Sequence, residues 1–150
     1  MNAPAWRIRP MQASDVAAVV SIQQASPEAA RWSAADYERA TGQATYATVA
    51  EAQGRVVAFL VARVVSDELE ILNMAVQPDA RRQGVASLLL ANALDSGRAS
   101  RATHAFLEVR QSNRGAIAFY ERHGFTDRGR RARYYTDPVE DALILARLLA

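Results

Sequence analysis

The stretch ILNMAVQPDARRQGVASLLL, residues 71–90, decides the fold. It begins inside an apolar run, residues 68–76, that predicts a β-strand. A loop with two arginines and one glycine, residues 81–87, follows that strand. Residues 82–96 carry apolar side chains at helical spacing, and Gly97 is the predicted end of this helix. The stretch therefore predicts a strand, a glycine-containing loop and a long helix in direct succession.

The residues on both sides of this stretch extend the prediction to one domain, residues 1–150. The strand–helix–strand unit over residues 70–110 implies one parallel pair in a mostly antiparallel sheet, and therefore an α+β fold. The predicted strands are residues 5–9, 45–51, 55–65, 68–76, 103–110, 125–131 and 140–148, and the predicted helices run from Ser14 to before Pro27, from Ser33 to Gly42, over 82–96 and from Asn113 to His123.

Composition excludes several kinds of chemistry. The 150 residues contain no cysteine, which removes disulfides, thiolate zinc sites and a cysteine nucleophile. All 18 basic residues are arginine, so neither a Schiff-base lysine nor a P-loop lysine is present. With two histidines, no metal site is expected. The longest strongly apolar run, Val56–Ala62, is far shorter than the roughly 20 residues that span a membrane, so we expect a cytoplasmic protein.

The two halves of the chain differ in charge. Residues 1–75 contain six arginines and eight acidic residues, whereas residues 76–150 contain twelve arginines and eight acidic residues. We therefore expect an anionic ligand beside the second half of the chain and a cationic one beside the first.

The loop at residues 81–87 suits an anion. The first N–H groups of a helix are free and carry a charge of about +0.5. Gly84 and Ala86 allow a phosphate to approach the backbone, and Arg81 and Arg82 add positive charge. The alternative is an ordinary loop with two solvated arginines, because glycine-containing helix starts are common.

Three further features carry candidate catalytic or binding groups. Glu108 is a lone carboxylate in an apolar strand, where it acts as a general base or simply pairs with an arginine. Asn113 and Tyr120 lie two helical turns apart on one face, so they line a cleft or serve as a helix cap and a core residue. The third feature is a cluster of arginines, Arg128, Arg130, Arg131 and Arg133, beside Tyr134 and Tyr135. This cluster either binds RNA or is an exposed strand face.

Taken in order, these motifs resemble a known family. Arg81-x-x-Gly84-x-Ala86, after a strand ending Asn73-Met74-Ala75-Val76, is similar to the pyrophosphate loop of the GCN5-related N-acetyltransferases (GNAT), with Ala86 where a second glycine is commoner. Within that family, the second half of the chain resembles the RimI-type enzymes, which acetylate the N-terminal alanine of a small-subunit ribosomal protein. The segments that carry this resemblance are Leu107-Glu108-Val109-Arg110, Ser112-Asn113, Ala116-Ile117-Ala118-Phe119-Tyr120-Glu121 and Gly124-Phe125. Trp32-Ser33 resembles their Pro-Trp-Ser segment, with Arg31 in place of the proline.

The resemblance covers nearly the whole chain and assigns roles to individual residues. It implies six to seven strands, about four helices and a parallel strand pair at the cofactor site. Glu108 is implied as the general base, Tyr120 as the general acid, and Trp32 and Tyr134 as substrate contacts. The residues implied in binding acetyl-CoA are Met74, Ala75, Val76, Arg82, Gln83, Gly84, Val85, Ala86, Ser87 and Asn113. A backbone N–H near Ala75 or Val76 is the expected donor to the oxyanion.

The implied activity is transfer of acetyl from acetyl-CoA to the N-terminal α-amine of a protein, such as a ribosomal protein beginning with alanine, without metal or direct contact with nucleic acid. A small-molecule amine or a protein lysine is the alternative acceptor, and an RNA-binding module is the alternative of another class. We expect the acceptor in a groove between residues 26–33 and 134–139. Six acidic residues near this groove favour a basic peptide: Glu28, Asp36, Glu38, Asp67, Glu68 and Glu70.

Overall fold

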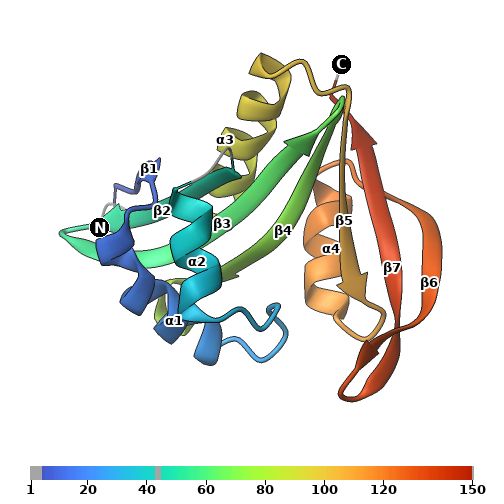
Figure 1. Ribbon diagram of the computed structural model, residues 1–150, viewed down its shortest axis with the longest axis horizontal. Coiled ribbons are helices and arrows are strands. Elements are labelled where there is room, and N and C mark those ends of the chain that lie inside the picture. Colours follow the sequence, from blue (N-terminus) through green and yellow to red (C-terminus); the bar gives the residue numbers. More distant parts are fainter. Residues whose placement is uncertain (1–4, 43–44, 150) are drawn as a thin grey trace.

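The computed structural model describes residues 5–42 and 45–149 (Figure 1). Its elements follow the predicted order. The strands are β1 (Arg7–Pro10), β2 (Thr45–Ala52), β3 (Arg55–Val65), β4 (Glu68–Val76), β5 (His104–Arg110), β6 (Thr126–Thr136) and β7 (Val139–Leu148). The helices are α1 (Val16–Gln24), α2 (Ala34–Thr41), α3 (Val85–Ala99) and α4 (Arg114–Arg122), with short 3₁₀ turns η1 (Ala13–Asp15) and η2 (Pro78–Ala80).

All seven strands form one sheet in the order β1-β2-β3-β4-β5-β7-β6. Neighbouring strands are antiparallel except β4 and β5. These two run parallel because α3 returns the chain to the end of the sheet at which β4 begins. The predicted α+β fold and its single parallel pair are therefore confirmed.

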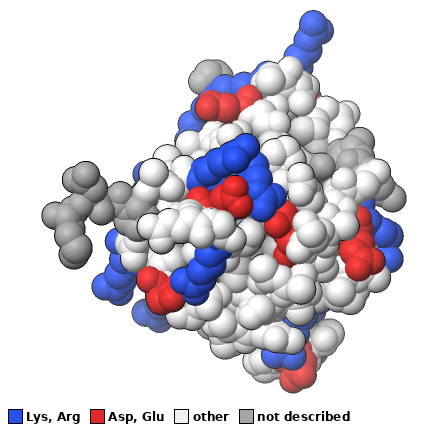
Figure 2. Space-filling view, turned by 90° about the vertical axis from the view of Figure 1, so that its left-hand side faces the viewer, with Lys and Arg blue, Asp and Glu red and all other residues white. Residues whose placement is uncertain are grey.

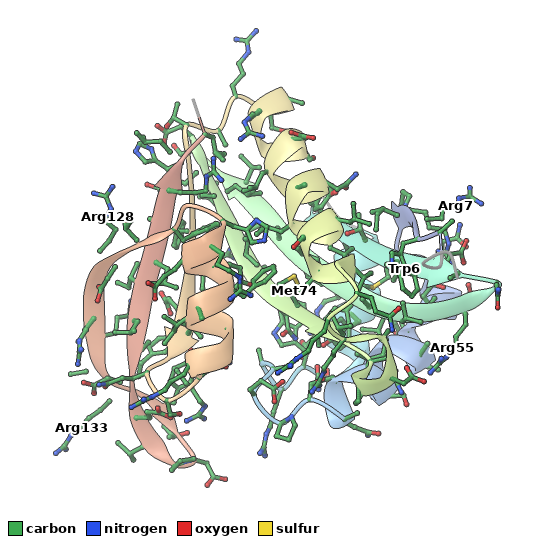
Figure 3. The ribbon with its side chains drawn as sticks, turned by 180° about the vertical axis from the view of Figure 1, so that it is seen from behind. Trp6, Arg7, Arg55, Met74, Arg128 and Arg133 are labelled. Carbon is green, nitrogen blue, oxygen red and sulfur yellow. The ribbon has the colours of Figure 1, made fainter. Side chains whose placement is uncertain are left out.

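Helices cover both faces of the sheet. Figure 1 shows α1 and α2 in front of β2–β4, and Figure 3, seen from behind, shows α3 and α4 on the opposite face. Two buried clusters match these layers: one joins the sheet to α3 and Tyr120 of α4, and the other joins it to α1 and α2 around Tyr37 and Phe59. None of the described helices combines the length and the apolar character needed to cross a bilayer.

A β-bulge in β4 changes which face its side chains reach. Val61 of β3 pairs with Asn73, but the next residue, Ala62, pairs with Ile71, so Leu72 is an extra residue. Before the bulge, Ile71 points into the cluster beneath α3. After it, the parity is reversed: Met74 and Val76 pack toward α3, whereas Ala75 packs toward α1 and α2. The bulge therefore turns the Asn73 side chain toward α1 and α2.

The two parallel strands separate beyond this bulge. Their pairing ends at Ile71 and Leu107, although β4 continues to Val76 and β5 to Arg110. Figure 1 shows β4 and β5 diverging toward their C-terminal ends. The separation leaves backbone groups of β4 without a neighbouring strand and opens the middle of the sheet.

Three predicted boundaries differ from the structure by three residues or more. Helix α3 begins at Val85 instead of residue 82, because Arg82 and Gly84 adopt left-handed backbone conformations with φ of 62° and 85°. Gly97 lies inside α3, where a Cβ atom would approach Leu69 Cδ2 to 3.1 Å, so close packing against β4 explains this glycine. Strand β6 extends to Thr136 instead of 131, because it continues pairing with β7 past a bulge.

Candidate active site

A large cleft fills the space where β4 and β5 separate. Its volume is about 1670 Å³, and it reaches from the segment 27–31 across the sheet to the β6–β7 hairpin. The β4 edge, the start of α3, the end of β5 and one side of α4 supply its other walls. The motifs that the sequence singled out at 74–76, 82–87, 108 and 113–120 meet in this one place.

The β4 edge presents alternate backbone groups to the cleft. The N–H of Gln77 donates to the carbonyl of Val57 in β3 at 2.7 Å. Successive residues of a strand point their N–H and C=O groups to opposite edges, so Ala75, two residues before Gln77, also points its backbone groups toward β3. Those of Met74 and Val76 then face the cleft. Of the two predicted oxyanion donors, Val76 has an N–H on the cleft side and Ala75 does not.

The start of α3 forms a concave set of free N–H groups. Gly84 is the N-cap residue, with φ of 85°, and Val85, Ala86 and Ser87 form the first turn of the helix. These three residues and Arg82 line the cleft. The arrangement fits a diphosphate, because the helix start supplies both N–H donors and a partial positive charge. The Gln83 side chain turns away and donates to the Asp79 carbonyl at 3.3 Å.

Arg81, which the sequence analysis expected to add positive charge beside an anion, binds other parts of the protein. Its Nε donates to the Val76 carbonyl at 3.1 Å, and its Nη2 donates to Ser26 Oγ at 3.0 Å and lies 3.7 Å from a carboxylate oxygen of Glu28. The guanidinium thus bridges β4 and the segment after α1, and Arg81 also lines the cleft. Two arginines of α4 that the sequence analysis missed, Arg114 and Arg122, line the cleft as well.

Glu108 extends from β5 into the cleft and is 13% exposed. Its Oε1 lies 3.1 Å from Nε of Arg131 on β6, so the predicted pairing with an arginine is present. The same carboxylate lies close enough to Tyr134 to raise the pKa of that phenol. The ion pair does not exclude a role as general base, because Arg131 is 56% exposed and the cleft side of the carboxylate is open to a ligand.

Tyr120 lines the cleft from α4 and is otherwise buried. Its ring packs edge-to-face against Phe119 and Phe125, with centroids 5.1 and 5.4 Å away. Burial raises the pKa of the phenol well above its usual value, so the hydroxyl keeps its proton at neutral pH. Both alternatives for Tyr120 therefore hold: its ring packs in the core, and the residue lines the cleft.

Asn113 caps α4, as the structural alternative predicted: its Oδ1 accepts a hydrogen bond from the N–H of Ala116 at 3.2 Å. It also lines the cleft, so the two interpretations coexist. At the other end of α4, Nε2 of His123 lies 3.0 Å from Ser87 Oγ. Burial lowers the pKa of His123, as do Arg122 and Arg147. This contact, which the sequence analysis missed, ties α4 to the first turn of α3.

The part of the cleft where the sequence analysis expected the acceptor differs in part from that prediction. Tyr134 lines it, but Trp32 is not among the described lining residues, and its ring packs 5.3 Å from that of Tyr37. Of the six acidic residues expected there, Glu28 alone is in the described lining. Figure 2 shows acidic and basic groups interspersed on the face that it presents, and Arg9, for example, pairs with both Asp15 and Glu51.

Acidic groups do reach the cleft from the β6–β7 hairpin, which the sequence analysis did not credit. Asp137 and Glu140 both line it. Arg110 holds the hairpin through the Pro138 carbonyl at 3.1 Å and Glu140 at 3.2 Å. Glu140 also accepts a hydrogen bond from the N–H of Ser112, and these contacts lower the pKa of its carboxyl group.

The arginine-rich segment of β6 is mostly an exposed strand face. Figure 3 shows Arg128 and Arg133 projecting outward, away from the cleft. Arg131 is the member that turns to Glu108. An RNA-binding role for this face stays a prediction.

Comparisons with known proteins agree with this geometry. A model of the acetyltransferase (GNAT) family matches residues 14–125. The chain is 36% identical to the [ribosomal protein bS18]-alanine N-acetyltransferase of Escherichia coli (strain K12), over 93% of this chain and 95% of that protein. It is 34% identical to the protein of the same description from Salmonella typhimurium, over 91% and 93%.

Two solved structures are similar over almost their full length. The crystal structure of the ribosomal-protein-S18-alanine N-acetyltransferase from Escherichia coli superposes with a TM-score of 0.85 at 33% identity, covering 97% of this chain and 95% of that one. That of Ard1 from Thermoplasma volcanium gives 0.86 at 31% identity, with 97% and 99% covered.

Proposed function

Because this chain belongs to the acetyltransferase (GNAT) family, we propose that it transfers acetyl from acetyl-CoA to the N-terminal α-amine of a protein. The proposed acceptor begins with alanine, and ribosomal protein bS18, named for the relatives, is the proposed substrate. The observation that carries the proposal is the cleft itself. It holds a carboxylate, a buried phenol and a helix start around the separated strands β4 and β5.

The residues fit the cofactor. The N–H groups at the start of α3, with Arg82 and Arg122, suit its diphosphate, and the outward-facing carbonyls of Met74 and Val76 suit the amide N–H groups of an extended pantetheine arm. Acetyl-CoA supplies the thioester that the amine attacks. The N–H of Val76 then donates a hydrogen bond that stabilises the negative charge developing on the acetyl oxygen.

Proton transfer favours an α-amine as the acceptor. An α-amine has a reference pKa of about 7.7–8.0, so making it neutral near pH 7 costs about 1 kcal/mol. A lysine amine, about 2.5 pKa units higher, costs roughly 3.4 kcal/mol more. Glu108, acting directly or through a water molecule, accepts that proton, and Tyr120 donates a hydrogen bond to the departing thiolate.

Gly84→Ala is expected to remove most of the rise in melting temperature that acetyl-CoA causes by binding the native state. The substitution forces a Cβ atom onto a residue with φ of 85° and distorts the N–H groups of the phosphate site. Gly54→Ala is the matched control, since Gly54 has φ of 77°, meets no atom within 4 Å and lies in the β2–β3 turn. An equal, full shift in both variants, measured by thermal denaturation, would contradict the assignment of the phosphate site.

The acceptor is tested with a set of peptides and mass spectrometry. We expect peptides beginning Ala-Arg to be acetylated faster than those beginning Ala-Glu, because Glu28, Asp137 and Glu140 line the acceptor side. An N-blocked peptide containing lysine should react slowest, for the pKa reason given above. Preference for the lysine peptide, or for a free small-molecule amine, would replace the proposed acceptor but leave the acetyltransferase activity in place.

A further inference from the structure

The segment 25–33, between α1 and α2, is held by side-chain amides that bind its backbone. The amide of Gln23 in α1 donates from Nε2 to the Trp32 carbonyl at 2.9 Å and accepts the Trp32 N–H at Oε1 at 3.1 Å. A side-chain amide that satisfies both backbone groups of one residue fixes that residue in position and in orientation.

Asn73 of β4 binds the same segment in the same way. Its Oδ1 accepts the Ala30 N–H at 3.2 Å, and its Nδ2 donates to the Ala30 carbonyl at 3.1 Å. Its Oδ1 also accepts the N–H of Met74, the residue whose backbone faces the cleft, at 3.1 Å. Asn73 is 5% exposed, so these bonds form away from competing water.

The Tyr37 hydroxyl joins the two amides. It donates to Oε1 of Gln23 and accepts from Nδ2 of Asn73 at 2.9 Å. The Tyr37 ring is fully buried between Trp32 and Phe59, which fixes the position of the hydroxyl. One continuous network of three side chains thus connects α1, α2 and β4 to two residues of the segment.

The network lies directly behind one wall of the cleft. Residues 27–31 line the acceptor side, and the network holds Ala30 on that wall and Met74 on the β4 edge through a single amide. Asn73 reaches this place only because the extra residue Leu72 turns it toward α1 and α2. A buried polar network of this kind defines one geometry more narrowly than apolar packing, since each group has one set of partners.

We propose that Gln23, Tyr37 and Asn73 are positioning residues that set the acceptor wall, residues 27–31, at a fixed distance from the β4 edge. They govern binding of the acceptor, whereas the diphosphate of acetyl-CoA binds at the start of α3, which the network does not contact. The inference uses the proposed function only for the chemical nature of the acceptor, because the network and the wall are present whatever amine is bound.

Tyr37→Phe tests the proposal with the smallest change. It removes the central hydroxyl but keeps the ring contacts with Trp32 and Phe59. We expect the KM for the acceptor to rise about 3- to 10-fold, the range for one net hydrogen bond, while the KM for acetyl-CoA and its thermal shift stay unchanged. Asn73→Asp, which keeps the shape and the acceptor oxygen but loses the Nδ2 donor, should raise the acceptor KM at least as much.

Tyr46→Phe is the matched control. The Tyr46 hydroxyl is buried without a hydrogen-bond partner among the described residues, and β2 carries it on the face beneath α3. Removing it should leave the acceptor KM unchanged. A rise in acceptor KM for Tyr46→Phe equal to that for Tyr37→Phe would show a general effect on packing and overturn the proposal.

Hydrogen exchange gives a readout that needs no acceptor. In Tyr37→Phe the amides of Ala30 and Trp32 should exchange faster, whereas those of α3 should not change. Unchanged exchange at both amides, or an acetyl-CoA KM that rises as much as the acceptor KM, would overturn the proposal. The KM values are measured with whichever amine the wild-type protein acetylates, so failure of the alanine peptides alone refutes the proposed acceptor and leaves this inference standing.

Discussion

Glu108→Gln is expected to lower turnover about 10²–10⁴-fold near pH 7, the usual contribution of a general base. Glutamine keeps the shape of the side chain but cannot accept the proton of the incoming ammonium. Acetyl-CoA should still raise the melting temperature fully, because Glu108 lies on β5, across the cleft from the helix start of α3. The loss should shrink as pH rises through about 7.7–8.0, since more of an α-amine is then already neutral. The measurement is kcat and kcat/KM against pH.

Two further variants separate this role from the ion pair with Arg131. Glu51→Gln removes a strand carboxylate with a similar environment: it is 19% exposed and lies 3.1 Å from Arg9, but it belongs to β2, away from the cleft. It should retain full activity. Arg131→Gln leaves the Glu108 carboxylate without its partner. If Arg131→Gln lost as much turnover as Glu108→Gln, and both losses were independent of pH, Glu108 would serve to hold β6 and would not act as a base.

The order of strands and helices could be predicted because each element carries its own local signal. Ser33 and Asp36 form the expected capping box at the start of α2, and Gln53-Gly54 form the expected turn between β2 and β3. The start of α3 was placed three residues early, since Arg82 looks like a helix former in sequence. Its positive φ depends on the fold of the loop and not on its own preference.

The functional residues could be predicted where one motif determines the position. Glu108 lies inside β5, where the sequence pattern put it, and Gly84 lies at the start of α3, two residues after the predicted first residue of the helix; both line the cleft. For Arg81 the sequence predicted only added positive charge, because spacing does not reveal that its guanidinium binds Val76 and Ser26. Trp32 was assigned to the acceptor, but it packs on Tyr37.

The bulge at Leu72 explains the largest gap between sequence and structure. The sequence analysis predicted residues 68–76 as one apolar strand and did not assign its side chains to the two faces of the sheet. One extra residue reverses the faces and gives Asn73 its place behind the acceptor wall. It also marks the point beyond which β4 and β5 no longer pair. The sequence does carry a trace of it, because Ile71 and Leu72 are adjacent apolar residues and the alternate apolar positions change from odd to even numbers there.

Tyr120→Phe is expected to lower kcat about 10²–10³-fold, the effect of losing one hydrogen-bond donor to a developing negative charge. Burial raises the pKa of this phenol, so it holds its proton at every working pH and is available as a donor. The same raised pKa makes complete proton transfer to a thiolate, with a reference thiol pKa of about 8.5, unfavourable. Tyr120 therefore acts by hydrogen bonding to the leaving sulfur, and a proton from water completes the step.

The stability of the same variant distinguishes this role from that of a core tyrosine. Phenylalanine keeps the contacts with Phe119 and Phe125, and burial is the one cause of the raised pKa, with no hydrogen bond to the hydroxyl from the described residues. Because Tyr120 lines the cleft and no described residue bonds its hydroxyl, removing that hydroxyl should leave the melting temperature of the free enzyme nearly unchanged. Tyr46→Phe, which loses an equally unpartnered hydroxyl outside the cleft, should show the same stability and full activity. A fall in melting temperature that parallels the loss of kcat in Tyr120→Phe would instead assign this tyrosine to the core alone, because a group that serves only the leaving thiolate contributes nothing to the free energy of folding.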